Sequence, residues 1–126
     1  IPRAGAEVIR KLDEQEGVII FPEGTSTKGE TLLPFNSSFL EFAASSDLPV
    51  YYASIRYTTP PGGPTPSERV CWWDDITFMA HLFRLFTLPS FKATVTFGES
   101  PITDPDRKKL ASSLHEGVET VFEPMP

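Results

Sequence analysis

At 126 residues, the chain is long enough for one domain with a single hydrophobic core and too short for two. Seventeen acidic against eleven basic side chains give a net charge of −6, which argues against nucleic-acid binding because a phosphate backbone attracts basic surfaces. No apolar run approaches the ~20 residues that cross a bilayer, no signal peptide is visible, and the single Cys71 excludes an internal disulfide and is typical of a reducing compartment.

The first elements are predicted to be a helix and a buried strand. Apolar residues on one side of a charged segment indicate a helix over residues 3–16, with Pro2 near its start and Gly17 just past its end. The continuous apolar run over residues 17–21 favours a short strand that is covered on both faces.

A second helix and strand are expected next. Ser38 and Glu41 have the capping-box spacing, so a helix is predicted to begin there. Residues 49–57 are rich in aromatic and branched side chains and are predicted to form a strand. The proline and glycine content of residues 58–68 predicts a loop without regular structure inside the domain.

The middle of the second half is dense in apolar residues. Residues 70–73 are a possible short strand, and Asp74-Asp75 are expected to cap a helix over residues 76–85. This helix is apolar on nearly all sides, so we favour packing on the sheet over contact of one face with an acyl chain or the bilayer surface. Residues 91–97 alternate between apolar and polar, which is typical of a half-buried strand.

A last helix is predicted after Asp104, which would be its N-cap, with Pro105 at the first helical position. Its apolar stripe has i,i+4 spacing. The residues of the stripe are Leu110, Leu114, Val118 and Phe122. The order of elements predicts an α/β fold whose sheet is largely parallel or mixed and flanked by helices.

The segment that follows the first predicted strand is the candidate site. An apolar run gives way at Pro22 to a carboxylate, a glycine, three hydroxyls and a lysine. These residues are Glu23, Gly24, Thr25, Ser26, Thr27 and Lys28. Gly24 would let an anion approach its backbone N–H, and Glu23 would hold neighbouring donors or a histidine by accepting their hydrogen bonds. Ligands of open α/β sheets bind outside the carboxyl ends of strands. A simple turn remains the alternative.

Read as a whole, FPEGTSTKGETLLPFNSSFLEFAA followed by LPVYYASIRY resembles the glycerolipid acyltransferase superfamily, which includes the lysophosphatidic acid acyltransferases. The matching blocks are Phe21–Thr25, Pro34-Phe35 and Leu48–Val50. The later WWDDITFMAHLFRLFTLP and VTFGESP resemble a bacterial branch that makes phospholipid or related acyl lipids.

The resemblance implies transfer of a fatty acyl group from acyl-CoA or acyl carrier protein to the hydroxyl of a lysophospholipid, without a cofactor or metal. It implies that Glu23, Gly24 and Thr25 hold the acceptor phosphate, with Ser26 and Lys28 as helpers, at the cytoplasmic face of the cell membrane. Independently, Arg56 is expected at a strand end, where it would meet phosphate or the acyl donor, or be a plain surface charge.

Two departures from the family pattern stand out. The family uses a histidine and, five positions on, an aspartate as general base and orienting group, but His81 and His115 are followed there by Phe86 and Thr120. With Ile1 as its first residue, the chain 1–126 is therefore expected to be the C-terminal part of one acyltransferase domain, inactive alone. Many relatives also carry arginine where Ser26 stands. Serine cannot form the bidentate hydrogen bonds that an arginine makes to phosphate.

Other interpretations of single residues lead to other functions. His81 is expected to be a packing residue, Cys71 a small buried thiol and Asp74-Asp75 a cap instead of a metal site. A non-catalytic lipid- or anion-binding module is the main alternative function, and a hydrolase built on Cys71 or His81 is a third. A sheet without its first strands would expose an edge and apolar surface, so we also expect self-association.

Overall fold

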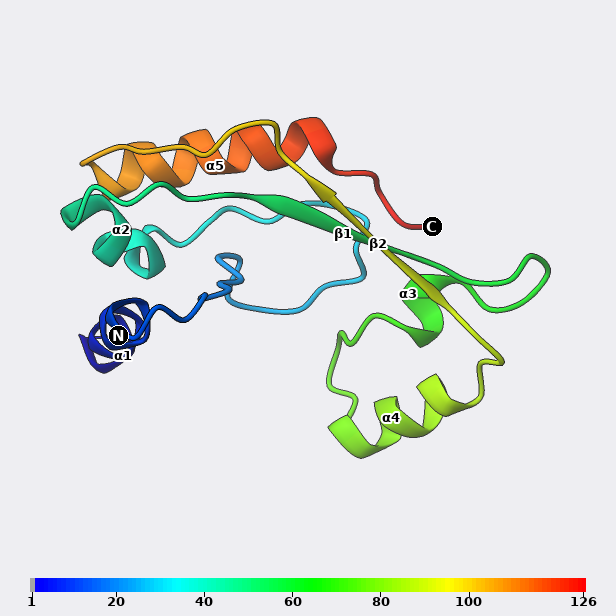
Figure 1. Ribbon diagram of the computed structural model, residues 1–126. Coiled ribbons are helices and arrows are strands. Elements are labelled where there is room, and N and C mark those ends of the chain that lie inside the picture. The colour runs from blue at the N-terminus through cyan, green and yellow to red at the C-terminus, as the bar shows by residue number, and fades with distance from the viewer. Residues whose placement is uncertain (1) are drawn as a thin grey trace.

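The computed structural model describes residues 2–126 and shows a mixed α/β chain, in which five α-helices accompany a two-stranded sheet over that range (Figure 1). Helix α5 lies along one end of the molecule and α4 lies at the other, with the sheet running between them. The elements are α1 (Pro2–Asp13), the 3₁₀ helix η1 (Ser37–Leu40), α2 (Glu41–Ser45), β1 (Ala53–Thr58), α3 (Pro66–Arg69), α4 (Phe78–Phe86), β2 (Lys92–Phe97) and α5 (Arg107–Val121).

The sheet is antiparallel, so the expected largely parallel sheet is wrong. Strands β1 and β2 pair in antiparallel register from Ala53↔Phe97 to Thr58↔Lys92, and an isolated antiparallel bridge joins Val50 to Ile102. The expected strand 49–57 therefore begins later than predicted, at Ala53.

The predicted strand over residues 17–21 does not form in the described chain. These residues form no regular secondary structure, and Ile19 is 85% exposed instead of covered. An apolar run signals that a segment can be buried, but a strand also needs a partner for its backbone N–H and C=O groups. None of the described segments provides that partner.

The core lies between α5 and the η1–α2 segment. The predicted stripe of α5 is confirmed at Leu110, Leu114 and Val118, which are buried. Leu110 is completely inaccessible to solvent and packs with side chains from η1 and α2. The buried cluster consists of Leu40, Ala43, Ala44, Leu110, Ala111 and Leu114.

One aromatic ring depends on two glycines beside this core. A Cβ atom added at Gly98 would collide with the ring of Tyr52, and one added at Gly117 of α5 would lie 2.8 Å from the same ring. The absence of these two side chains lets Tyr52 lie between the end of β2 and α5.

The helices begin and end at other residues than the sequence suggested. Helix α1 ends at Asp13 and not at residue 16 as predicted, and the left-handed residue after it is Gln15, with φ of 60°, and not Gly17. At η1 the cap is Asn36, whose Oδ1 accepts the Ser38 N–H at 3.0 Å, so Ser38 is a donor in this turn and not the cap.

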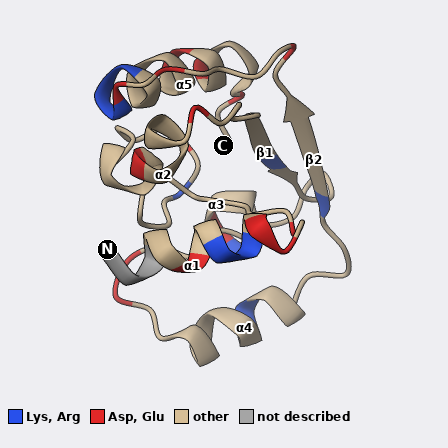
Figure 2. Cartoon of the chain, turned by 60° about the vertical axis from the view of Figure 1, so that its left-hand side comes forward, with Lys and Arg blue, Asp and Glu red and all other residues tan. Residues whose placement is uncertain are grey.

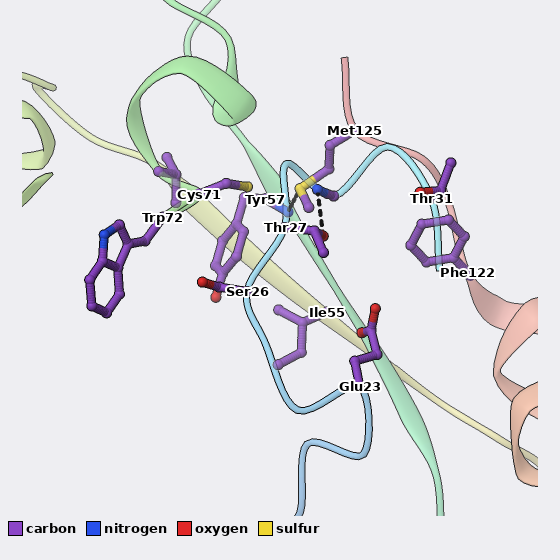
Figure 3. Close-up of a pocket in the computed structure, with 12 residues that line it drawn as sticks. Glu23, Ser26, Thr27, Thr31, Ile55, Tyr57, Cys71, Trp72, Phe122 and Met125 are labelled. Carbon is purple, nitrogen blue, oxygen red and sulfur yellow. Dashed lines mark hydrogen bonds between the residues drawn. The ribbon is translucent and has the colours of Figure 1, made fainter. Parts of the chain in front are cut away.

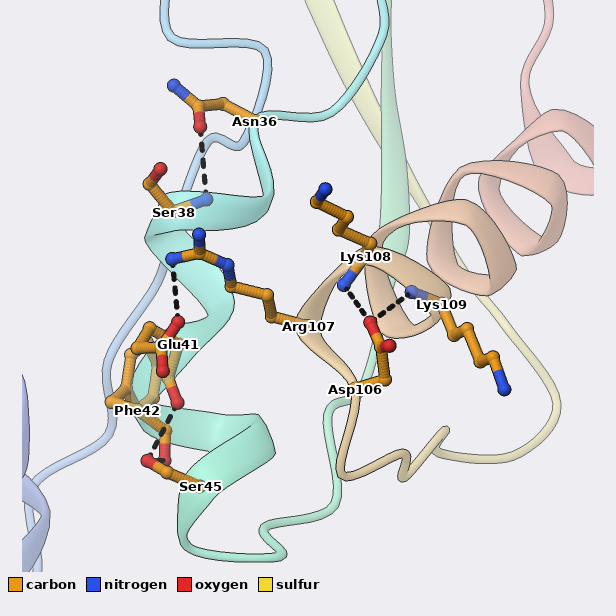
Figure 4. Close-up of polar contacts among 9 residues, drawn as sticks. All are labelled: Asn36, Ser38, Glu41, Phe42, Ser45, Asp106, Arg107, Lys108 and Lys109. Carbon is orange, nitrogen blue, oxygen red and sulfur yellow. Dashed lines mark hydrogen bonds and ion pairs between the residues drawn. The ribbon is translucent and has the colours of Figure 1, made fainter.

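The same shift occurs at α5, where Asp106 caps the helix instead of Asp104 (Figure 4). Its Oδ1 accepts the N–H groups of Lys108 at 2.8 Å and Lys109 at 3.2 Å, and these bonds lower the pKa of the Asp106 carboxyl, Lys109 contributing most. Asp104 instead accepts the Asp106 N–H at 2.7 Å. Arg107 joins α5 to α2 through an ion pair with Glu41 at 2.7 Å.

The segment between the strands contains the remaining corrections. The expected irregular loop includes α3, which begins with a capping box formed by Thr65 and Glu68. Residues 70–73 form no strand and instead follow the end of α3. Helix α4 is capped by Thr77 and not by Asp74-Asp75.

Both apolar elements at this end are more exposed than predicted. Helix α4 contains no buried residue, so the expected packing on the sheet is wrong, and all six residues of β2 are exposed instead of half-buried. Among the described residues, no helix combines the length and the apolarity that crossing a membrane requires.

Candidate functional site

The break after the apolar run is a tight turn. Pro22 and Glu23 occupy its middle, and the Gly24 N–H donates to the carbonyl of Phe21 at 3.1 Å. Gly24 has φ of 72°, a conformation that strains residues with a Cβ atom, which explains glycine at this position. Its N–H is used by the turn itself and does not point at a ligand.

A loop of about ten residues leaves this turn and returns to it. The Asn36 N–H donates to the Pro22 carbonyl at 2.8 Å, and the Leu33 N–H donates to Glu23 Oε2 at 2.9 Å. The prediction that Glu23 holds neighbouring donors is thus confirmed. Only one carboxylate oxygen is engaged by this bond, so the other is available to a ligand.

Beside this loop lies an open pocket of about 340 Å³ (Figure 3). One side is polar, because the loop contributes a carboxylate and three hydroxyls, and the other side is mostly apolar and aromatic. The lining residues are Glu23, Ser26, Thr27, Gly29, Thr31, Ile55, Tyr57, Val70, Cys71, Trp72, Phe122 and Met125. Such a pocket has room for a polar head group next to a hydrocarbon chain.

Met125 ties three segments together at this pocket. Its N–H donates to the Gly29 carbonyl at 2.9 Å, and its sulfur accepts the Tyr57 N–H at 3.2 Å. Gly29 has φ of 79°, and an added Cβ would collide with the Met125 side chain. The C-terminal segment thereby holds the loop against β1.

Two of the cations predicted for the site lie away from the pocket. The Lys28 ammonium sits 4.0 Å from the centroid of the Trp73 ring, a cation–π contact. Arg56 is paired with Glu123. Successive side chains of a strand point to opposite faces, so Arg56 points away from the pocket that its neighbours Ile55 and Tyr57 line.

The structure therefore divides the predicted site residues into two groups. Glu23 and Ser26 meet at the pocket, whereas Gly24, Thr25, Lys28 and Arg56 do not line it. Thr25 is exposed, and its hydroxyl makes one long contact of 3.5 Å with the Ser26 carbonyl.

Several lining residues escaped the sequence analysis. Tyr57 belongs to the predicted strand over residues 49–57. Phe122 belongs to the predicted stripe of the last helix, but α5 ends at Val121 and Phe122 follows it in extended conformation. Trp72 and Met125 carry no local pattern that marks them as site residues, because the folding of distant segments brings them to the loop.

The candidate nucleophile and bases are poorly placed for catalysis. Burial raises the pKa of the Cys71 thiol, so it is protonated at neutral pH and a weak nucleophile. His81 stacks on Trp72 with the ring centroids 6.2 Å apart, and His115 contacts Phe35 edge-on at 5.1 Å. Neither histidine lines the pocket. Within residues 2–126, no group of three or more His, Cys, Asp or Glu side chains is placed to hold a metal ion.

Comparison with known proteins identifies relatives of the chain. Residues 3–56 match the family described as Acyltransferase. Three curated proteins named lyso-ornithine lipid O-acyltransferase are similar. The one from Rhodobacter capsulatus is 29% identical over 108 residues (80% of this chain, 38% of the relative). The one from Brucella abortus is 25% identical over 130 residues (94% and 49%). The one from Rhizobium meliloti is 31% identical over 111 residues (80% and 37%).

The chain thus spans less than half the length of each of these curated relatives. None of the solved structures matches it.

Proposed function

Because the chain belongs to the acyltransferase family, we propose that it supplies the acceptor-binding part of an enzyme that transfers a fatty acyl group to the hydroxyl of a lyso-lipid. Acyl-CoA or acyl carrier protein is the proposed donor. We further propose an acceptor of the lyso-ornithine lipid type in place of the lysophospholipid that the sequence suggested, in line with the names of the relatives.

The charged residues that line the pocket are the main support for this acceptor. Glu23 is the one ionised side chain among its lining residues, and no Lys, Arg or His lines it in the described chain. A phosphate group would meet the Glu23 carboxylate as a like charge, with no cation among the lining residues of the described chain to offset the repulsion. The acceptor phosphate implied for this site by the family resemblance is therefore disfavoured here.

An amine head group suits the same pocket. The side-chain amine of ornithine is protonated at neutral pH, as the side-chain amine of lysine is. It would pair with the free oxygen of Glu23 and donate to the hydroxyls of Ser26, Thr27 and Thr31. The rings of Tyr57 and Trp72 at the other side offer cation–π contacts and apolar surface for the chain that follows.

Acyl transfer also needs a base for the acceptor hydroxyl, most often a histidine, and no histidine lines the pocket in the described chain. His81 and His115 are engaged in aromatic contacts elsewhere. We propose that the base is a histidine–aspartate pair from another part of the polypeptide, as the family resemblance implies. The lack of a histidine in the described pocket also favours a second candidate, a lipid-binding module without catalysis.

The test uses the complete gene product with labelled acyl donor and two acceptors, lyso-ornithine lipid and lysophosphatidic acid. We expect transfer to lyso-ornithine lipid, and Glu23→Gln should lower kcat/KM for it about tenfold or more, because loss of a charged hydrogen bond costs about that much. Glu30→Gln is the matched control, since Glu30 is exposed in the same loop and does not line the pocket.

A preference for lysophosphatidic acid, or equal effects of the two variants, would contradict the proposed acceptor. Saturable binding of either lipid without transfer from either donor would favour the binding module.

A further inference from the structure

Helix α4 has two sides of opposite character, in contrast to the uniformly apolar helix that its sequence suggested. At 100° per residue, its polar positions fall on one side and its large apolar side chains on the other. The polar side carries His81 and Arg84, together with Ala80. The opposite side carries Phe78, Met79, Phe83 and Phe86.

The apolar side faces solvent. Phe83 is 68% exposed and Phe86 is 74% exposed, and Phe78 and Met79 are also more than half exposed. Leu82, which lies between Phe78 and Phe86 around the helix, and Leu85, near the boundary of the two sides, are half-buried. The exposed side chains give α4 an apolar surface open to solvent, a feature that marks a contact site.

The charge around this surface points to its partner. The protein carries a net charge of −6, yet α4 contains no acidic residue and one cation, Arg84. Figure 2 shows acidic segments on α1, α2 and α5 and in the loop that leads into α4, and a single basic segment on α4 itself. The exposed Asp74 and Asp75 lie before the helix begins, and the helix itself carries no carboxylate. An apolar helix side edged by arginine fits a lipid bilayer, whose headgroup region is often anionic.

The same surface is continuous with the pocket through Trp72. The Trp72 ring packs edge-on against Phe78 at 5.7 Å and stacks with His81, and Trp72 also lines the pocket. Trp72 is partly exposed. Tryptophan favours the boundary between hydrocarbon and water, so its place between helix and pocket suits a membrane interface.

We propose that α4 lies in the surface layer of a lipid bilayer, with Phe83 and Phe86 in the hydrocarbon and Arg84 among the headgroups. Nine residues of helix extend about 14 Å, which is too short to span a bilayer of ~30 Å but suits a helix parallel to the surface. The mouth of the pocket would then open at the membrane, where a lyso-lipid enters without crossing water. This binding does not depend on which head group the pocket selects.

The experiment measures co-sedimentation of the complete gene product with vesicles in the absence of any acyl donor or lyso-lipid. The vesicles contain phosphatidylcholine alone or with about one third phosphatidylglycerol. We expect the protein to bind, and the double variant Phe83→Gln/Phe86→Gln to lower vesicle affinity about tenfold or more, because two exposed rings lose their burial in hydrocarbon. Circular dichroism should show an unchanged fold, since neither ring is buried.

Phe97→Gln is the matched control, because Phe97 is 73% exposed on β2 and lies at the end of the strand away from α4 (Figure 1). Arg84→Gln is a second variant and should weaken binding about fivefold to the anionic vesicles only. Lipids brominated in their chains should quench the fluorescence of Trp72, and Trp72→Phe should remove most of this quenching.

Failure of the wild-type protein to bind either vesicle would overturn the proposal, as would equal losses for Phe97→Gln and the double variant. If the double variant abolishes self-association but leaves vesicle binding intact, the surface belongs to a second copy of the chain and the proposal is wrong. Acceptor preference is measured in the separate transfer assay, so failure of the proposed function gives a different result.

Discussion

The two ends of this molecule differ in what they do with their apolar side chains. At the α2–α5 end, leucines and alanines from three helical segments enclose one another, and Leu110 has no exposed surface. At the α4 end, the large apolar side chains of the helix, among them Phe83 and Phe86, remain open to solvent.

This difference indicates that one end stabilises the fold and the other end serves binding. Enclosed apolar side chains stabilise the fold, whereas exposed ones contribute little to stability and much to binding. The pocket lies between them, held by hydrogen bonds to the loop and lined toward α4 by Trp72. Substitutions should therefore separate stability from binding according to the end at which they are made.

The largest loss of stability is expected for Leu110→Ala. Removing a fully buried leucine leaves a cavity and should lower the free energy of unfolding by about 2–5 kcal/mol. Phe83→Ala, at the other end, should change it by less than about 0.5 kcal/mol because the ring is exposed. Denaturant unfolding measures the free energy of unfolding of both variants. Similar losses would contradict the assignment of stability to the α2–α5 end.

A smaller loss is expected where Tyr52 meets the glycines. Gly98→Ala places a Cβ against the rigid ring and should cost about 1–3 kcal/mol by overpacking. Gly17→Ala is the control, because nothing lies within 4 Å of its added Cβ, and it should leave stability unchanged or slightly higher. Thermal unfolding distinguishes the two, and an unaffected Gly98→Ala would show that Tyr52 is not held there.

At the pocket, two replacements of Glu23 should separate the fold of the loop from its binding. Glu23→Ala leaves the Leu33 N–H without its partner and should cost about 1 kcal/mol, whereas Glu23→Gln keeps an acceptor oxygen and should cost less. Amide exchange at Leu33 reports the hydrogen bond directly. Equal protection of Leu33 in Glu23→Ala and the unmodified protein would show that this bond does not hold the loop.

The smallest effect is expected from the cap of α5, and it should depend on pH. The folded-state pKa of Asp106 is lowered from 3.8, so its stabilising contribution is present above that value and is lost as the pH falls through the folded pKa. Asp106→Ala should lower Tm by a few degrees at neutral pH, and the difference should shrink as the pH falls below 3.8 and through the lowered folded-state pKa.

Asp106→Asn keeps an acceptor oxygen without the charge, so its stability relative to alanine should not vary with pH in this range. A deficit of Asp106→Ala that stays constant down to pH 2 would contradict the assigned cap.

The sequence predicted the features that depend on neighbours in the chain. The buried stripe of α5 follows from i,i+4 spacing, and the turn at Gly24 follows from a proline and a glycine in suitable positions. The hydrogen bond of Glu23 was predicted in kind, although its partner, Leu33, lies ten residues away.

Features that depend on distant segments were not predictable in the same way. Residues 17–21 have the composition of a strand, but composition does not supply a partner, and the sheet joins β1 to β2 instead. The aspartates at 74 and 104 have the residue type of N-caps. The N-caps of α4 and α5 are instead Thr77 and Asp106, which directly precede the first residue of each helix. The pocket is formed by a loop, a strand and the C-terminal segment, so no single stretch of sequence predicts it.

The acceptor preference of the pocket tests the central claim most directly. The claim is that the Glu23 carboxylate, without a cation beside it, selects an amine head group. In the complete gene product, we would compare kcat/KM for lyso-ornithine lipid and lysophosphatidic acid before and after Ser26→Arg, with Ser112→Arg on the exposed side of α5 as the control. The account predicts that the unmodified protein prefers lyso-ornithine lipid and that Ser26→Arg moves the ratio at least about tenfold toward the phosphate. An unmodified protein that prefers lysophosphatidic acid, with a ratio that Ser26→Arg leaves unchanged, would contradict it.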